Sequence, residues 1–122
     1  MLSLGQPVRV YLAPGSTDMR KSFDALTGLV ATVLEANPLS GHVFAFCNRR
    51  RTQVKLLVWD GTGLWVHAKR LAKGTFAWPH VEPGQARVEL EAEQLSWILG
   101  GLDLSQAKRR TWWRRTPGLL AS

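Results

Sequence analysis

Cysteine is nearly absent from the sequence, since Cys47 is the only one among 122 residues. A single thiol cannot form an internal disulfide and offers no paired-cysteine metal site, so we expect a chain suited to a reducing cytoplasm. Long apolar runs are also missing, because no stretch approaches the roughly 20 residues that span a bilayer. The N-terminal residues lack the basic and apolar regions of a secretory signal. The sequence therefore predicts a soluble, cytoplasmic protein without a membrane partner.

Acidic residues are scarce, with nine Asp and Glu against sixteen Lys and Arg, and the formal net charge is +7. This balance favours a polyanionic partner, above all nucleic acid. The carboxylates are scattered, and no spacing predicts that several of them converge on catalytic metal ions. The three histidines have no metal-ligand spacing either. We therefore expect no enzymatic activity, no metal and no cofactor, and a nuclease is only a distant alternative.

Hydrophobic periodicity predicts a strand over residues 8–12 and a core-facing helix over 22–36. Apolar and other residues then alternate in three segments, 42–47, 54–59 and 64–69, and their short connections predict an antiparallel meander. Further expected elements are short strands over 75–78 and 87–90 and a helix over 92–99. The predicted fold is a small α+β domain over residues 1–104, in which the antiparallel sheet packs against one main helix. A basic tail follows over residues 105–122.

The segment PGSTDMRKSFD, Pro14–Asp24, reads as a loop that starts the main helix. Ser16, Thr17 or Asp18 can cap that helix by accepting a backbone N–H bond, and the free N–H groups of its first turn can receive an anion. Arg20 and Lys21 place two cations at the helix start, which is unfavourable unless something negative binds there. A phosphate site and a simply capped helix with solvated cations both fit this pattern.

The segment Asn48–Gln53 carries three consecutive arginines, Arg49, Arg50 and Arg51, at a predicted hairpin tip. Such a tip projects positive charge that phosphate backbones attract, although a solvated turn that discourages edge aggregation is the alternative. Further cations extend the basic patch if they share its face of the sheet: Lys55, Lys69, Arg70 and Lys73. Strand parity allows this for Lys55 and Lys69 if the pairing register agrees.

The tail combines cations with two adjacent rings. Lys108, Arg109, Arg110, Arg114 and Arg115 enclose Trp112 and Trp113. The rings can stack on bases or wedge into a groove, while a membrane surface, a partner protein or plain disorder are the other interpretations.

Other conspicuous residues have structural explanations. Trp59, Trp65 and Trp97 lie in strand or helix patterns, so core packing is the default for them. Asp60 precedes a glycine and is expected in a turn. Cys47 is expected to be a small core residue.

Three stretches in this order resemble a known family, the small accessory protein of insertion-sequence-66-type bacterial transposable elements, called TnpB or the second open reading frame. They are VYLAPGSTDMRKSFDAL (Val10 to Leu26), SGHVFAFCNRRRTQVKLLVWDGTGLWVHAKRL (Ser40 to Leu71) and the Gly74-x-Phe76-x-Trp78-Pro79 that follows. QLSWILGGLD (Gln94 to Asp103) is similar to the family's closing helix. The resemblance covers most of residues 8–79, and it rests on the order and spacing of the motifs together.

The resemblance implies a role in transposition beside a separate, larger transposase that carries the metal-binding carboxylates. It supplies no site residues. Ala68 and Cys47 depart from the residues common in the family at those places, and the tail after Trp112 is not a family feature.

Our sequence-based hypothesis is an accessory protein that holds transposon DNA through its phosphates with weak sequence reading. The residues expected to bind nucleic acid are Arg20, Lys21, Arg49, Arg50, Arg51, Lys55, Lys69, Arg70, Arg109, Arg110, Arg114 and Arg115. The alternative is an adaptor that binds the transposase without touching DNA. The sequence leaves the oligomeric state open, and an unpaired edge strand over residues 8–12 is compatible with a dimer.

Overall fold

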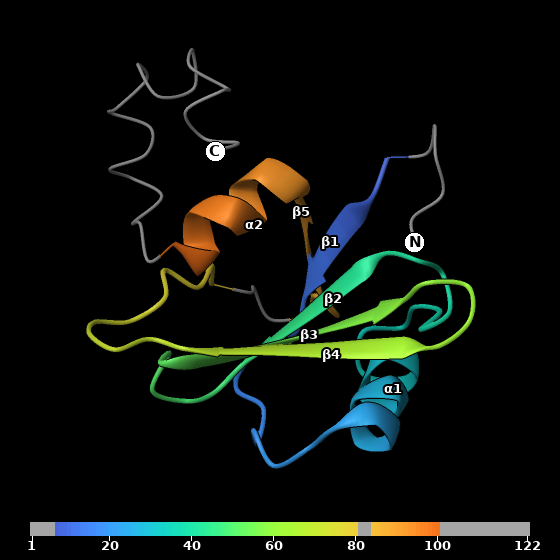
Figure 1. Cartoon of the computed structure of the whole chain (residues 1–122), viewed down its shortest axis with the longest axis horizontal. Helices are drawn as coiled ribbons and strands as arrows, with labels where there is room; N and C mark the ends of the chain where they lie inside the picture. Colours follow the sequence, from blue (N-terminus) through green and yellow to red (C-terminus); the bar gives the residue numbers. More distant parts are fainter. Residues whose placement is uncertain (1–6, 81–83, 101–122) are drawn as a thin grey trace.

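The computed structural model describes residues 7–80 and 84–100. Its elements follow the chain as β1 (Arg9–Leu12), α1 (Phe23–Thr32), β2 (Val43–Cys47), β3 (Gln53–Trp59), β4 (Leu64–Arg70), β5 (Val88–Glu91) and α2 (Ala92–Leu99). The strands form one five-stranded sheet in the order β4-β3-β2-β1-β5. The two helices lie on opposite sides of this sheet (Figure 1).

The sheet is mixed, which corrects the prediction of a wholly antiparallel one. β2, β3 and β4 pair antiparallel with their chain neighbours, but β1 runs parallel to β2. The reason is the crossover through α1, which returns the chain in the same direction. β5 then pairs antiparallel with the free side of β1. β1 is therefore an interior strand, and the expectation of an unpaired edge at residues 8–12 is wrong.

Side chains alternate between the two faces of β2 as the sequence predicts. Phe44 and Phe46 are fully buried on the side of α1, where they pack with Leu26, Val30 and Leu34. Ala45 and Cys47 face α2 and pack in a second cluster with Leu95 and Ile98. Each large side chain buried in this way stabilises the fold by about 1.5–3 kcal/mol. The sheet thus has an apolar core on both faces.

Helix α1 is shorter than predicted, because it ends at Thr32 and the chain reaches a φ of 55° at Glu35. Arg87, which precedes β5, occupies this end of the helix. Its Nη1 donates to the carbonyl oxygens of Leu34 at 2.5 Å and Glu35 at 3.2 Å. A cation suits the partial negative charge at a helix C-terminus. The periodicity up to residue 36 therefore reflects apolar packing after the helix has stopped.

The last elements agree with the sequence except at residues 75–78. The strand predicted over 87–90 is β5, and α2 has the predicted bounds. Residues 75–78 form no strand, although Phe76 is buried and its N–H donates to the carbonyl of Arg51 at 2.7 Å. Within residues 7–80 and 84–100, neither helix has the length and apolar character needed to cross a membrane.

Candidate nucleic-acid interface

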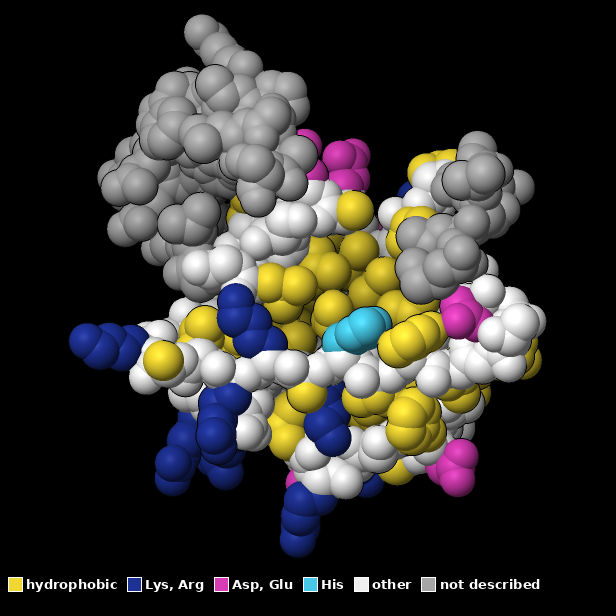
Figure 2. Space-filling model, in the orientation of Figure 1, with side chains coloured by type: hydrophobic (Ala, Val, Ile, Leu, Met, Phe, Trp, Pro, Cys, Tyr) yellow, Lys and Arg dark blue, Asp and Glu magenta, His cyan; other side chains and the backbone are white. Residues whose placement is uncertain are grey.

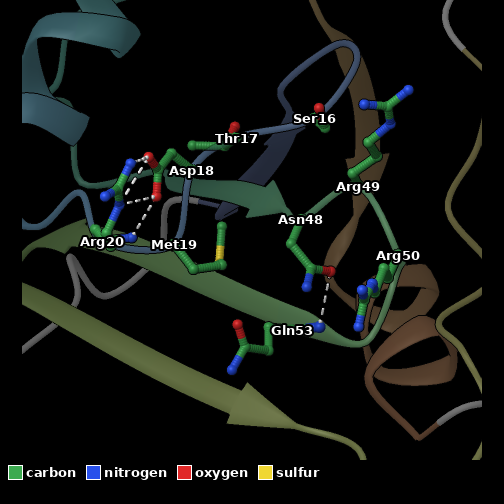
Figure 3. Close-up of a pocket in the computed structure, with 9 residues that line it drawn as sticks. All are labelled: Ser16, Thr17, Asp18, Met19, Arg20, Asn48, Arg49, Arg50 and Gln53. Atoms are coloured by element: carbon green, nitrogen blue, oxygen red, sulfur yellow. Dashed lines mark hydrogen bonds and ion pairs between the residues drawn. The ribbon is translucent and has the colours of Figure 1, made fainter.

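An open groove of about 720 Å³ lies between the loop that follows β1 and the turn that joins β2 to β3 (Figure 3). The loop is held beside the end of β2, because the N–H of Thr17 donates to the carbonyl of Cys47 at 2.8 Å. The groove is lined by Ser16, Thr17, Asp18, Met19, Arg20, Asn48, Arg49, Arg50 and Gln53. It therefore brings together the two segments that the sequence singles out, which are about 30 residues apart in the chain.

Asn48 holds the β2–β3 turn in shape through both ends of its amide. Its Oδ1 accepts hydrogen bonds from the backbone N–H groups of Thr52 at 2.9 Å and Gln53 at 3.0 Å. Its Nδ2 donates to the Thr52 hydroxyl at 3.1 Å. The turn is thus rigid at its base, and Arg49 and Arg50 are exposed at its tip. The sequence indicates the turn but not this role of Asn48.

Arg51 differs from its two neighbours. Its φ is 61°, and its Nη1 donates to the carbonyl oxygen of Gly15 at 3.0 Å. The guanidinium also lies 6.0 Å from the centre of the Trp78 ring. Gly15 itself has a φ of 66°, a left-handed conformation that favours glycine. Arg51 therefore joins the turn to the loop, whereas the sequence places it with the arginines that project into solvent.

Arg20 forms an ion pair with Asp18 on the other rim of the groove (Figure 3). Nη2 lies 2.6 Å from Oδ2, and Nε donates to both carboxylate oxygens at 3.0 and 3.1 Å. These hydrogen bonds lower the pKa of Asp18 to about 2. The Arg20 side chain is nevertheless 91% exposed. Exposed ion pairs contribute little to stability, so an incoming anion can compete with Asp18 for Arg20.

The start of α1 does not use the predicted caps. Ser22 is the N-cap residue and makes no side-chain capping bond. Thr17 is buried beside β2, and Asp18 accepts a hydrogen bond from the N–H of Arg20 at 2.9 Å. The expectation that Ser16, Thr17 or Asp18 caps the helix is therefore wrong, because the loop makes a separate turn before the helix begins.

The strand register separates two lysines that the sequence allows, but does not require, to share one face of the sheet. Lys55 lies opposite Ala68, so Lys69 lies opposite Val54 and leaves the sheet on the other face. The Lys55 ammonium donates to the carbonyl of Lys21 at 2.7 Å, near the groove. The Lys69 ammonium donates to the carbonyl of Leu99 at 2.6 Å, at the end of α2. Lys55 and Lys69 therefore do not share a face of the sheet.

A smaller depression of about 300 Å³ continues from the groove, with which it shares Met19 and Gln53. It extends past Lys55 to the end of β4, where Lys69 and Arg70 border it. In Figure 2, Lys and Arg side chains gather at the lower left of the view, while most visible Asp and Glu side chains lie at the top and right. Six of the predicted cations therefore border this groove and depression: Arg20, Arg49, Arg50, Lys55, Lys69 and Arg70.

The remaining residues that the sequence singles out lie outside the groove. Asp60 accepts hydrogen bonds from Thr62, Gly63 and the Trp65 ring nitrogen, which hold its pKa well below the usual range. Trp65 is 50% exposed, so core packing does not explain it. Cys47 is buried, and burial raises the pKa of its thiol. Within the described part of the chain, no three His, Cys, Asp or Glu residues gather as a metal site.

The predicted tail site lies outside the described residues. This applies to Lys108, Arg109, Arg110, Arg114 and Arg115, to both tryptophans between them and to the predicted boundary near residue 104.

Comparison with known proteins gives one family and two relatives. The family model described as "IS66 Orf2 like protein" matches residues 8–109. Uncharacterized protein y4hO of Sinorhizobium fredii (strain NBRC 101917 / NGR234) is 40% identical over 116 residues, which cover 95% of this chain and 97% of the relative. Uncharacterized protein y4jC of the same organism is 30% identical over 110 residues, which cover 90% and 92%. No solved structure gives a significant match.

Proposed function

Because the chain belongs to the IS66 Orf2-like family, we propose that it is a non-catalytic accessory protein of transposition that binds transposon DNA through the basic groove. The observation that carries this proposal is the convergence of exposed cations from two distant segments. Arg20 lies on one rim with Lys21 beside it, and Arg49 and Arg50 lie on the other. An adjoining depression adds Arg70.

The proposed mechanism is electrostatic. Each cation that meets a phosphate releases condensed counterions. The logarithm of the affinity therefore falls linearly with the logarithm of the salt concentration, and the slope is proportional to the number of contacts. Arg51 and Asn48 do not contact the DNA themselves but position the turn that carries Arg49 and Arg50. The oxygen of the Asn48 amide already accepts two hydrogen bonds from the turn, and one of its two N–H groups is also used there, so this amide cannot pair bidentately with an adenine edge. The groove therefore holds the DNA backbone with weak sequence preference.

The test is fluorescence anisotropy with a labelled transposon-end duplex and a scrambled duplex across a salt series. We expect affinity to fall steeply with salt, and the double variant Arg49→Ala/Arg50→Ala to flatten the logarithmic slope by roughly 0.9 for each lost contact. The control is Arg9→Ala, which removes one positive charge at the start of β1, where Arg9 pairs with Glu89. Absence of binding at low salt would overturn the proposal.

The second candidate is an adaptor that binds the transposase of the same element without contacting DNA. Exposed apolar side chains favour it, since Trp65 and Leu39 are each 50% exposed and Phe23 is 47% exposed. The ring of Trp65 is held in place by its hydrogen bond to Asp60. Pull-down of the purified transposase in the presence of nuclease, lost on Trp65→Ala, would support the adaptor. Retention of DNA binding by that same variant would separate the two functions.

A further inference from the structure

We infer that the basic groove selects double-stranded over single-stranded nucleic acid. This inference rests on the proposed DNA binding and specifies its ligand. The first observation is the composition of the groove. Among the described residues that line it and the adjoining depression, charged, amide, hydroxyl and aliphatic side chains occur, but no aromatic ring does. Proteins that hold single strands depend on such rings, because stacking a base on one tightens binding by roughly 5-fold to 150-fold.

Other rings of the sheet and its loops already have partners in the fold. The Arg51 guanidinium lies over the ring of Trp78 at 6.0 Å. Farther from the groove, toward the start of β2, Tyr11 stacks on Phe44 with 5.6 Å between ring centres, and Arg87 lies over the Tyr11 ring at 5.0 Å. These contacts belong to the fold, so a base would have to displace them. The protein offers no ready stacking platform at this end of the sheet within the described residues.

Among the described residues, the most exposed aromatic side chains belong to other surfaces. Trp65 stacks on His67 with 5.6 Å between ring centres and an angle of 5° between the planes. Both residues leave β4 on the face of Lys69, opposite the face of Lys55. Phe23 is exposed at the first turn of α1 but does not line the groove. Lys69 shares the face of Trp65, but its ammonium already donates to the carbonyl of Leu99. A single strand held by Arg20, Arg49 and Arg50 would therefore have to bend around the sheet to reach these rings.

The way in which the cations are held favours a duplex instead. Arg49 and Arg50 are carried on a turn whose base is fixed by Asn48, so their positions suit a rigid ligand. A duplex supplies rigid phosphates with one negative charge per about 1.7 Å of axis. A flexible single strand has to be ordered on binding, and without stacking little compensates for that loss of entropy. The groove is also open, so a bulky duplex can approach it (Figure 3).

The test compares how much the groove contributes to the affinity for two ligands of equal length, a duplex and a single strand. Full-length protein and its Arg49→Ala/Arg50→Ala variant are titrated with a labelled 20-base-pair duplex and with one of its strands at low salt. We expect the variant to lose at least about tenfold affinity for the duplex and no more than about threefold for the strand. An equal or larger loss on the single strand would overturn the inference and leave DNA binding intact. No loss on either ligand would overturn the groove as the DNA site.

A gain-of-function variant tests whether the lack of a stacking ring is what weakens single-strand binding. Gln53→Trp adds a ring to the groove, and we expect it to tighten single-strand binding at least fivefold with little change on the duplex. Ser96→Trp places the same ring on α2, which packs on the other side of the sheet, and serves as the matched control. Circular dichroism confirms that each variant is folded. Unchanged single-strand affinity in a folded Gln53→Trp protein would contradict the stacking argument.

Discussion

The Arg51 guanidinium donates to the carbonyl oxygen of Gly15 across 3.0 Å, which joins two segments 36 residues apart in the chain. Together with the backbone hydrogen bond from Thr17 to Cys47, this bond holds the loop that follows β1 beside the β2–β3 turn. It also explains why three consecutive arginines are not equivalent, since only Arg49 and Arg50 of the run are exposed.

Arg51→Ala should therefore behave as a structural variant. We expect it to lower the free energy of unfolding by about 1 kcal/mol, because one hydrogen bond and one ring contact are lost. Urea denaturation measures this change. Arg49→Ala should leave stability unchanged and flatten the salt dependence of DNA binding, whereas Arg51→Ala should change the slope less. If both variants flattened the slope equally at unchanged stability, Arg51 would be a phosphate contact.

Asp18→Asn should strengthen DNA binding. The substitution removes the negative charge that pairs with Arg20, so the guanidinium is free to meet a phosphate. We expect tighter binding at low salt and a logarithmic salt slope steeper by up to roughly 0.9, as for one additional contact. The matched control is Asp24→Asn, which removes the same charge from α1 outside the groove. Equal gains in both variants would indicate a general charge effect rather than release of Arg20.

Acid should weaken the fold through its hydrogen-bonded aspartates. The pKa of Asp18 is lowered from 3.8 to about 2, and the pKa of Asp60 lies well below its usual range. A lowered pKa in the folded state means that the ionised group stabilises the fold above the unfolded pKa. This contribution is lost as pH falls from about 4 through the folded pKa, which is about 2 for Asp18 and lower for Asp60.

Asp60→Ala should thus be less stable than the parent at pH 7, since Thr62, Gly63 and Trp65 lose their acceptor. The difference should shrink at pH 2.5, when the parent has also lost much of this contribution. Urea denaturation at the two pH values measures it. An equal deficit at both values would show that the carboxylate charge is not what stabilises the turn.

Arg87→Ala should destabilise the protein without affecting DNA binding. The side chain satisfies the carbonyls of Leu34 and Glu35 and covers the Tyr11 ring, so we expect a loss of about 1–3 kcal/mol in the free energy of unfolding. Arg87→Lys should recover part of this loss, because an ammonium can reach one carbonyl but cannot reproduce the planar fork. A flatter salt slope in a folded Arg87→Ala protein would contradict the structural role.

The sequence predicts those elements whose signal is local. The alternation through Phe44, Ala45, Phe46 and Cys47 gives the correct faces of β2, and the apolar spacing of Leu95 and Ile98 gives α2. It does not predict that β1 lies between β2 and β5, because strand partners distant in the chain leave no periodic signal. Nor does it give the β3–β4 register, on which the faces of Lys55 and Lys69 depend.

The candidate site is likewise predictable only in part from the sequence. The two basic segments are visible in the sequence as Arg20-Lys21 and Arg49 to Arg51. Their meeting around one groove is a tertiary fact, and so are the partners that change individual roles, such as Gly15 for Arg51 and Asp18 for Arg20. Arg87 is missed entirely, because an isolated arginine before a strand has no motif that indicates a helix end as its partner.

The place of β1 beside β5 has a consequence for how the protein forms. The ladder joins residues 9–12 to 88–91, so the first strand obtains its second partner only when nearly the whole described chain exists. During synthesis, β1 can dock on β2 soon after residue 47 has left the ribosome, but its other edge stays open until β5 emerges. Pairing over such sequence separations is slow, and open edges invite aggregation. A product that stops before residue 88 should therefore aggregate or be degraded rather than persist as a partly active fragment.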